Sequence, residues 1–485
     1  MKRCKMILTV LLAAILMASC NSVENAETET AAEGQKESVP ETEAETKAHD
    51  DLPETDMNGG IFNILVRQEK AYEFVAEQTG EVVSDAVFNR DLSLEERFNA
   101  SIEYIQAPGL WNSTASYQGL ITNSVMANDS SYDIVTGQSN IVLPLATNGM
   151  YRNLGDSDYI DYSKPYWKDG YLQNARIFGN LYAVVGDYAL TTVTDTNCLF
   201  FNTKVMDDFS IAYPYDLVRD GKWTMDAFLS MIEQVSVDLD GNGTMDDTDQ
   251  FGLMIDGHGL NSFQYGFGCS LTTPNAEGIH AVDFPSDQDV TIYETVNEMT
   301  KAPYFLLSSD IKTEGYSDVS AFASDKILFM GARLVKVEEL RDMEADFGII
   351  PNPKYDEAQK EYRSSVMRTV TVAALPTTTS RYEESEMILE AMASEGYNSI
   401  IPAYYEVTLK GKYSRDTDTA DMLDIVTGSA YIAFADVFYT ELGACSDMMT
   451  SFINSNQGIV SFFASKKAGI ENNLESLYKT YSELN

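Results

Sequence analysis

Oxygen-bearing side chains recur at a regular spacing between residues 238 and 249, which read Asp-Leu-Asp-Gly-Asn-Gly-Thr-Met-Asp-Asp-Thr-Asp. Oxygen ligands stand at the first, third and fifth positions, a glycine at the sixth and an acid at the twelfth. This spacing is typical of an EF-hand calcium loop, with Asp in place of the closing Glu. A solvated acidic turn is the alternative interpretation, because Asp, Asn and Gly also favour turns. We expect a structural Ca²⁺ with these ligands: Asp238, Asp240, Asn242, Thr244 through its carbonyl, Asp246 and Asp247, with Asp249 as the alternative closing acid.

The segments on either side of this loop predict its role. Thr224 is a good N-cap for a helix, and Trp223 before it is placed to pack on Phe228. After the loop, residues 250–254 read as a strand, whereas an EF-hand would continue into a second helix. The loop is therefore expected to hold its surroundings together and not to act as a calcium switch.

The N-terminus has the pattern of an export signal. Lys2, Arg3 and Lys5 precede an apolar run, residues 6–17, that is too short to span a membrane. Ala18-Ser19-Cys20 then resembles the lipobox of bacterial lipoproteins, although Met17 stands where Leu is usual. The resemblance implies that residues 1–19 are removed as a signal peptide and that Cys20 carries a lipid; an ordinary secretory peptide is the alternative.

Residues 20–58 are acidic and nearly free of aliphatic side chains, so we expect them to form a disordered linker. Lipid and linker together would anchor the folded part of the chain to the outer face of the cell membrane.

The composition narrows the choice of partners. The net charge of −42 comes from 75 acidic against 33 basic residues, and such a surface repels nucleic acid. Neutral or cationic ligands remain compatible with it. Beyond the lipobox, Cys198, Cys269 and Cys445 are too few and too far apart to indicate a disulfide framework.

The rest of the chain alternates between strands and helices, which predicts an α/β fold. Ligands of such folds collect at the carboxyl ends of strands, and Gln138 and Ser139 stand at one such end. Ser380-Arg381-Tyr382-Glu383 reads as a capping box that opens a later helix. We expect strands at 60–66, 101–105, 132–135, 197–202, 250–254, 326–330, 346–350 and 369–375, and helices over 83–98, 117–127, 223–235, 292–299 and 470–481.

The order of these features resembles the extracellular solute-binding proteins of ABC importers, in particular the carbohydrate-binding group that includes maltose-binding protein. The resemblance spans residue 59 to the C-terminus. Its main elements are the lipobox, Tyr132-Asp133-Ile134-Val135, the stretch 181–187 followed by the strand 199–202, the Trp-Thr helix that leads into the loop 238–249, and the strands at 326–333, 347–351 and 369–375.

The resemblance implies a type II fold like that of periplasmic binding proteins, with two α/β lobes joined by a multi-segment hinge. Lobe I would cover 59–190 with 372–398 returning to it, lobe II would cover 191–371, and 399–485 would complete lobe II and the hinge. The protein would be a monomer and not an enzyme. It would capture a sugar or oligosaccharide between closing lobes and deliver it to the permease subunits of an ABC transporter.

A sugar site requires aromatic faces for C–H groups and polar side chains for hydroxyls. The residues that we expect to contact the ligand lie at strand ends and near the crossings between lobes. For each of them, core packing or an ordinary salt bridge is the alternative. They are Gln138, Ser139, Asp187, Tyr188, Arg333, Tyr404 and Tyr405.

Two other functions stay open. A binding lipoprotein for a peptide or a polyamine would keep the fold and change the ligand. A surface glycosidase needs only two carboxylates, which an acidic chain offers without a recognisable motif. Against an enzyme, the chain has only three His and lacks the Gly-x-Ser-x-Gly and His-Glu-x-x-His motifs.

Overall fold

The computed structural model describes residues 47–410 and 417–484, which belong to one compact unit, Lys47–Asn485. The expected signal peptide (1–19), Cys20 and residues 21–46 of the expected linker lie outside the described residues. Among those described, no helix is long and apolar enough to cross a membrane.

Residues 47–58 were expected to belong to the linker, but they pack on the folded unit. The carboxylate of Asp50 accepts two hydrogen bonds from Arg97, at 2.8 and 2.6 Å, and the Asp51 carboxylate lies 2.7 Å from Lys164 Nζ. Met57 is fully buried. The folded part therefore begins at 47 and not at 59, because these contacts offset the entropy lost on ordering the segment.

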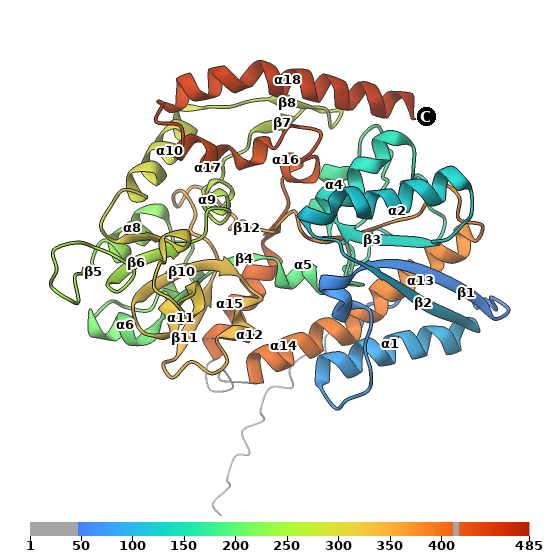
Figure 1. The fold of residues 1–485 in the computed structure, drawn as a ribbon, viewed down its shortest axis with the longest axis horizontal. Helices are drawn as coiled ribbons and strands as arrows, with labels where there is room; N and C mark the ends of the chain where they lie inside the picture. The colour runs from blue at the N-terminus through green and yellow to red at the C-terminus, as the bar shows by residue number, and fades with distance from the viewer. Residues whose placement is uncertain (1–46, 411–416, 485) are drawn as a thin grey trace, which may run out of the picture. The chain divides into compact units, whose positions relative to one another are not determined.

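The first lobe consists of a four-stranded sheet and the helices that cover it. Its elements are β1 (Gly60–Arg67), η1 (Gln68–Glu73), α1 (Val82–Phe98), β2 (Ala100–Ala107), η2 (Trp111–Ser113), α2 (Thr114–Ala127), β3 (Ile134–Gln138), α3 (Ser139–Val142), η3 (Leu143–Asn148), α4 (Asp169–Ala175) and β13 (Thr371–Ala374). The strand order is β13-β3-β1-β2, with β1 parallel to β2 and β3 and with β13 antiparallel to β3. Figure 1 shows α1 and α2 on opposite sides of this sheet, which explains why β1 is apolar on both faces.

The second lobe is built on a six-stranded sheet. Its elements are β4 (Asn197–Asn202), α6 (Thr203–Asp208), α7 (Tyr215–Arg219), α8 (Met225–Ile232), β5 (Ser236–Val237), β6 (Gln250–Ile255), α9 (Leu260–Gly266), β7 (Thr272–Pro274), β8 (His280–Val282), α10 (Asp287–Met299), β9 (Phe305–Leu307), η4 (Ser308–Asp310), α11 (Asp318–Ala323), β10 (Ile327–Arg333), α12 (Lys336–Glu339) and β11 (Phe347–Ile350). The order is β11-β4-β10-β6-β5, and β9 pairs with β6. Strands β6, β9 and β10 are parallel, and β4 runs against both of its neighbours. α8 starts as expected: Thr224 caps it, and the Trp223 and Phe228 rings lie 5.8 Å apart.

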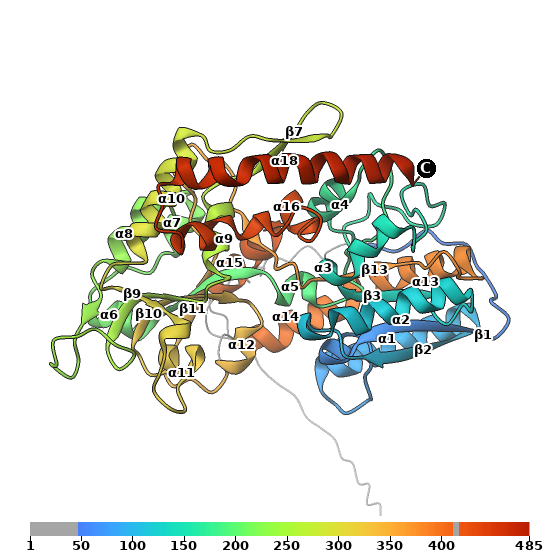
Figure 2. The ribbon, with the colours of Figure 1, turned by 45° about the horizontal axis from the view of Figure 1, so that its top comes forward.

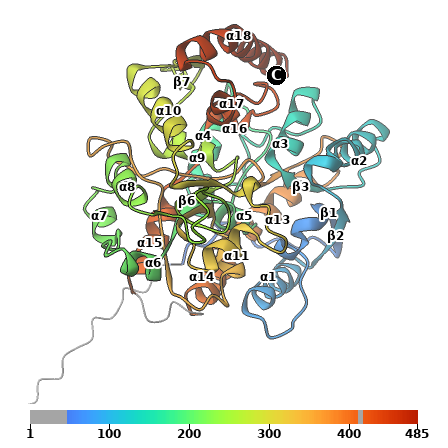
Figure 3. The ribbon, with the colours of Figure 1, turned by 60° about the vertical axis from the view of Figure 1, so that its left-hand side comes forward.

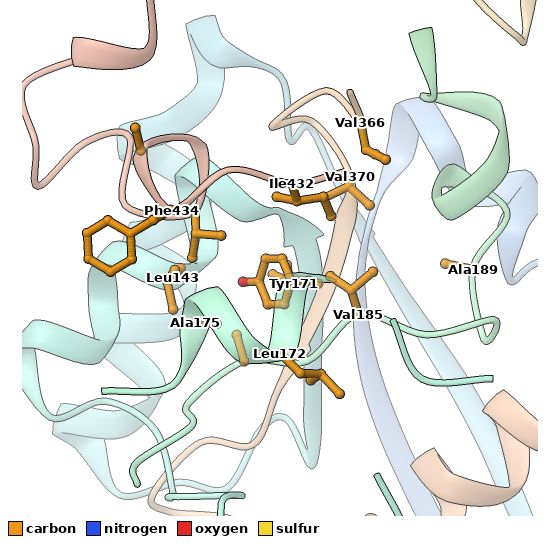
Figure 4. Close-up of a cluster of buried hydrophobic side chains, with 14 of the residues drawn as sticks. Leu143, Tyr171, Leu172, Ala175, Val185, Ala189, Val366, Val370, Ile432 and Phe434 are labelled. Atoms are coloured by element: carbon orange, nitrogen blue, oxygen red, sulfur yellow. The ribbon is translucent and has the colours of Figure 1, made fainter. Parts of the chain in front are cut away.

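Two antiparallel segments cross between the lobes side by side. The first contains α5 (Thr191–Thr194) and leads into β4, and the second leads into β13. They pair at Val184 with Ala373 and at Thr196 with Val366. Figure 4 shows Tyr171 of α4 lying beside Val370 of the second crossing, in an apolar cluster that also contains Ile432. One side of the crossing segments is therefore packed against an apolar cluster.

The C-terminal part packs on both lobes, although 399–485 was expected to complete lobe II and the hinge. β12 (Ser364–Ser365), α13 (Tyr382–Glu395) and the start of η5 (Gly396–Ile400) precede it. Its elements are α14 (Ile401–Lys410), α15 (Thr417–Gly428), β14 (Ala430–Tyr431), α16 (Phe434–Val437), η6 (Cys445–Asp447), α17 (Met448–Ile453) and α18 (Ile459–Glu483). α14 packs on α1 of the first lobe, and α15 packs on β11 of the second. Figures 2 and 3 show α18 running across one side of the unit, above α10 and α4.

The capping box expected at Ser380–Glu383 is wrong. Helix α13 begins at Tyr382, and its N-cap residue, Arg381, makes no side-chain cap bond. The Arg381 side chain instead lies 3.0 Å from Glu384 and donates to the carbonyl of Met57. The N-terminal segment thus supplies contacts at this helix start that local sequence does not encode.

Candidate ligand site at the hinge

Polar strand ends from both lobes meet at the two crossing segments. In the first lobe, β1 ends at Arg67 and β3 ends at Gln138, beside β13. In the second lobe, β10 ends at Arg333, which pairs with Asn197 at the start of β4. The carboxyl ends of parallel strands are where α/β folds bind ligands, so this is the candidate ligand site.

A buried network fixes the end of β1 to the crossings. Arg67 donates to Thr371 Oγ1 at 2.7 Å, and Thr371 Oγ1 in turn donates to Glu73 at 2.7 Å. The other Glu73 oxygen accepts from the backbone N–H of Thr191 at 2.7 Å. Arg67 and Glu73 are both almost fully buried, and the Arg67 Nε has no partner among the described residues.

A second cluster joins the two lobes through one carboxylate. Asp195 Oδ1 lies 3.5 Å from Lys70 Nζ of the first lobe and 3.1 Å from Arg333 of the second. Its Oδ2 accepts from Thr369 Oγ1 at 2.7 Å. Burial alone would raise the pKa of Asp195, but the cations Lys70, Arg333 and Arg67 hold that pKa below its ordinary value. The carboxylate is thus ionised and fully enclosed, while the cations that it holds are partly exposed.

A third polar group lies on the second crossing. Arg368 contacts the carboxylate of Asp447 at 3.1 Å and lies 4.0 Å from the centre of the Tyr439 ring. Tyr439 and Asn261 also donate to Asp447, at 2.7 and 3.1 Å. Burial and the bond to Asp447 raise the pKa of Tyr439 to about 12, so its hydroxyl stays protonated.

Two exposed aromatic rings stand near the end of β1. Trp111 is 65% exposed and Tyr72 is 44% exposed, high values for rings of this size. Gly109 donates its N–H to Glu69, which ties the Trp111 loop to the residues after β1, and Lys70 donates to the Tyr72 hydroxyl at 3.0 Å. Trp111 thus presents an exposed ring on the loop after β2, whereas the Tyr72 ring lies with Lys70 Nζ 5.5 Å from its centre.

The second lobe has a small cavity of about 30 Å³ at the ends of β6 and β10. Its polar lining comes from Arg333, Lys336, Asp256, Asp318 and Ser308. Lys336 is held by Asp318 at 3.2 Å and by a second acid of its own helix. Arg333 therefore contacts both the cavity and the Asp195 cluster.

The structure brings Gln138, Ser139 and Arg333 to the hinge. Gln138 pairs with Thr371 of β13, and Ser139 donates its N–H to the carbonyl of Val370. Gln138 and Ser139 are buried, whereas the Arg333 side chain is 37% exposed. Their role as ligand contacts stays a prediction.

Asp187 and Tyr188 lie on the first crossing but face the interior. The Asp187 carboxylate is 2.7 Å from Lys168 Nζ and accepts from Thr192 Oγ1. Tyr188 is fully buried and donates to backbone carbonyls of both crossings, Val184 and Thr371. Through these contacts Asp187 and Tyr188 stabilise the hinge.

Tyr404 and Tyr405 lie on α14. Tyr404 is buried in the apolar cluster of the second sheet, and Tyr405 packs against the same cluster. The role of both tyrosines as ligand contacts stays a prediction.

Sequence reasoning missed Lys70, Trp111 and Asp195. Trp111 carried a usable signal, because it precedes a helix directly after a strand, where a loop at the sheet edge is expected. Asp195 had no such local signal. It is a single acid after three threonines, and its partners come from segments that are distant in the sequence.

The calcium-type loop lies between α8 and β6, as expected. Ligand oxygens of Asp238, Asp240 and Asp249 lie within 4.8 Å of one another, a spacing that suits one cation. Asp247 instead accepts from the backbone of Lys312 and Thr313. The donor set fits a hard cation with Asp249, the alternative acid, in the closing position.

No protein-family model matches the chain, and no curated protein sequence matches it. Solved structures do. The sugar-binding protein MalE from Xanthomonas citri superposes with a TM-score of 0.60 at 11% identity, over 87% of this chain and 99% of that one. The extracellular solute-binding protein from Staphylococcus aureus, solved in complex with maltose, gives 0.59 at 11% identity, over 88% and 100%. The GacH receptor of Streptomyces glaucescens, solved unliganded and with acarbose, gives 0.53 at 13% identity, over 87% and 98%.

This chain has their fold. The type II fold of periplasmic binding proteins, expected from the order of sequence features, is confirmed. At this level of identity the likeness concerns the fold and not the residues that bind a ligand.

Proposed function

We propose that this protein captures a sugar or an oligosaccharide at the hinge between its two lobes and delivers it to the permease of an ABC transporter. The observation that carries the proposal is the meeting of hydrogen-bond donors from both lobes, Lys70 and Arg333, at one buried carboxylate. The exposed Tyr72 ring is bonded to Lys70, and the exposed Trp111 follows a loop that Gly109 ties to Glu69.

That combination suits the chemistry of a saccharide. Hydroxyl groups accept from ammonium and guanidinium groups, and the C–H faces of a pyranose pack on aromatic rings. The known proteins with this fold support the same class, since several of them were solved in complex with maltose, maltotetraose or acarbose.

The hinge charges argue for a neutral ligand. Each cation named at the site has a carboxylate partner: Arg67 with Glu73, Lys70 and Arg333 with Asp195, Arg368 with Asp447, and Lys336 with Asp318. The same pairing weakens the polyamine alternative, because Asp195 and Asp447 are already neutralised.

The glycosidase alternative also loses support from these contacts. A retaining or inverting mechanism requires one carboxyl group to act as acid and another as base or nucleophile. Asp195 is enclosed and bonded through both oxygens, and Asp447 accepts from Arg368, Tyr439 and Asn261. Neither is arranged to exchange a proton with a substrate, which supports a binding protein without catalytic activity.

The proposal includes attachment to the membrane through a lipid on Cys20, on the outer face of a bacterial cell, with the protein as a monomer. Delivery would follow from a shift toward the closed form on ligand binding, which the permease would recognise.

Isothermal titration of the protein against a panel of mono- and oligosaccharides, with peptides and polyamines alongside, tests the ligand class. Saturable binding of a saccharide without release of hydrolysis products is the expected result. Product release would show an enzyme, and binding of a peptide or polyamine alone would move the protein to another transport class.

A further inference from the structure

We infer that Asp195 is a positioning residue of the ligand site, which sets both the spacing of the Lys70 and Arg333 donors and the charge selectivity of the site. This inference rests on the proposed function, since it concerns how that same site chooses among saccharides. Asp195 does not contact the ligand itself, because its side chain is completely buried.

Asp195 lies among four chain segments. It follows α5 on the first crossing, and its Oδ2 is held by Thr369 of the second crossing at 2.7 Å. Its backbone carbonyl accepts from the N–H of Met367 at 3.0 Å. Both crossings therefore fix the carboxylate, and a change of the lobes' relative orientation starts from this fixed point.

The two cations at Asp195 come from different lobes. Lys70 lies directly after β1 of the first lobe, and Arg333 is the last residue of β10 in the second. Both approach the same oxygen, Asp195 Oδ1, at 3.5 and 3.1 Å. Without a carboxylate between them, two like charges at this separation repel strongly in a partly buried setting.

The two cations are partly exposed to solvent, whereas Asp195 is not. The Lys70 and Arg333 side chains are 17% and 37% exposed, whereas that of Asp195 is 0% exposed. A ligand at the hinge thus meets N–H donors of both lobes but not the buried acid that both of them contact. The remaining Arg333 donors have no protein partner among the described residues and border the cavity at the end of β10.

Asp195 consequently holds the donors of both lobes together and offsets one of their two positive charges. Replacing it with an amide removes one negative charge close to both cations while keeping a similar shape. The site then carries excess positive charge, which favours an acidic sugar over a neutral one.

The test compares wild type with Asp195→Asn by isothermal titration. The probes are neutral disaccharides (maltose, cellobiose and xylobiose) and disaccharides of glucuronic and galacturonic acid. Wild type is expected to prefer the neutral sugars. In Asp195→Asn the affinity for neutral sugars falls, and the ratio of neutral to acidic affinity shifts toward the acidic sugars by about tenfold, as expected for one charge at short range.

Asp50→Asn is the matched control, because it also removes a poorly exposed carboxylate paired with an arginine, Arg97, on the N-terminal segment. Its neutral-to-acidic ratio should equal that of wild type. A purely structural role for Asp195 would lower the affinities for both sugar classes together, leave the ratio unchanged and overturn the inference.

Lys70→Gln provides a second test, which does not depend on the stability of Asp195→Asn. It removes one cation and leaves Asp195 paired with Arg333, so discrimination against acidic sugars should increase. A shift in the same direction as the expected Asp195→Asn shift, or no shift, overturns the inference. Failure of wild type to bind any saccharide would instead refute the proposed function.

Discussion

The residues of the hinge divide into those that hold the site together and those that remain available to a ligand. Asp187, Tyr188, Arg67 and Glu73 are buried, and each is bonded to a neighbouring side chain or to the crossing backbone. Trp111 is the opposite case, a large ring 65% exposed. An exposed ring of this size is available to pack on the C–H face of a sugar.

Replacing Trp111 with Ala should weaken saccharide binding about tenfold, because a ring packed on a pyranose contributes on the order of 1 kcal/mol. The melting temperature should stay unchanged, since an exposed ring adds little to the core. Titration of the variant against the saccharide that binds wild type measures the effect. Met126→Ala, at the other end of α2 and 77% exposed, is the control and should bind as wild type does. Equal affinities for wild type and the Trp111 variant would remove this ring from the site.

Glu390 is a second residue with a measurable consequence. It is buried on α13 and accepts from Tyr166 Oη at 2.5 Å and from Trp167 Nε1 at 2.8 Å. Burial raises its pKa to about 7, against an opposing effect of those two hydrogen bonds. Because the folded pKa exceeds the unfolded one, the stability that Glu390 contributes is fully present below about pH 4.5 and is lost as the pH rises through 7.

We therefore expect Glu390→Gln to reduce the loss of stability between pH 5 and pH 8 by on the order of 1–3 kcal/mol. Denaturant unfolding at several pH values measures it. Glu383→Gln, an exposed acid on the same helix, should keep the wild-type dependence. Parallel pH profiles for wild type and Glu390→Gln would contradict the expectation.

Single residues were the least predictable part of this molecule. Arg333 and Gln138 could be placed because each ends a strand of an α/β sheet, and such folds bind ligands at strand ends. Lys70 and Asp195 could not, since their pairing depends on contacts between segments more than a hundred residues apart. Tyr404 and Tyr405 stay predictions, since Tyr404 lies in the apolar cluster of the second sheet and Tyr405 packs against it.

At the scale of elements, local signals worked where the element carried its own pattern. The helix at 225–232 has its cap in Thr224, and the apolar strands at 60–67 and 327–333 formed where expected. The start of α13 and the segment 47–58 departed from expectation for one reason: each is ordered by the other, through Arg381 and the Met57 carbonyl. Such mutual contacts leave no trace in a local window of sequence.

The calcium-type loop, residues 238–249, predicts that the protein is stabilised by Ca²⁺. Ca²⁺ should raise the melting temperature, with a stabilisation of about 2–3 kcal/mol when its concentration is about a hundred times the dissociation constant. The structure places Asp249 with Asp238 and Asp240, while Asp247 is engaged by the 312–313 backbone. Asp249→Asn should therefore abolish the calcium-induced shift, and Asp247→Asn should retain it.

Calorimetry with chelator and then with added Ca²⁺ decides between these outcomes, and Mg²⁺ serves as the ion control. A melting curve of wild type that does not respond to Ca²⁺ would favour the solvated acidic turn. Loss of the response in Asp247→Asn alone would restore the ligand set expected from sequence.

At the scale of the folded unit, the two lobes are linked by more than the paired crossings. Tyr481 of α18 contacts Tyr182 of the first lobe, and Phe463 of the same helix contacts Phe284 of the second. A rotation that brings the strand ends together around a ligand has to preserve or exchange these aromatic contacts. The side of the unit that carries α18 is therefore restrained, and the motion is expected on the side of Lys70 and Arg333.

Saturation with the bound saccharide should then reduce the radius of gyration, because hinge closure brings the lobes together around the ligand. Small-angle scattering of the chain that begins at Cys20, with and without ligand, measures the change, and a saccharide that does not bind in titration is the control. Asp195→Asn makes the expectation more specific. If Asp195 couples Lys70 to Arg333, the variant should show a smaller compaction even at saturating ligand, since repulsion between the two cations opposes closure. An unchanged profile for wild type at saturation would show that ligand binding does not depend on rotation about these crossings.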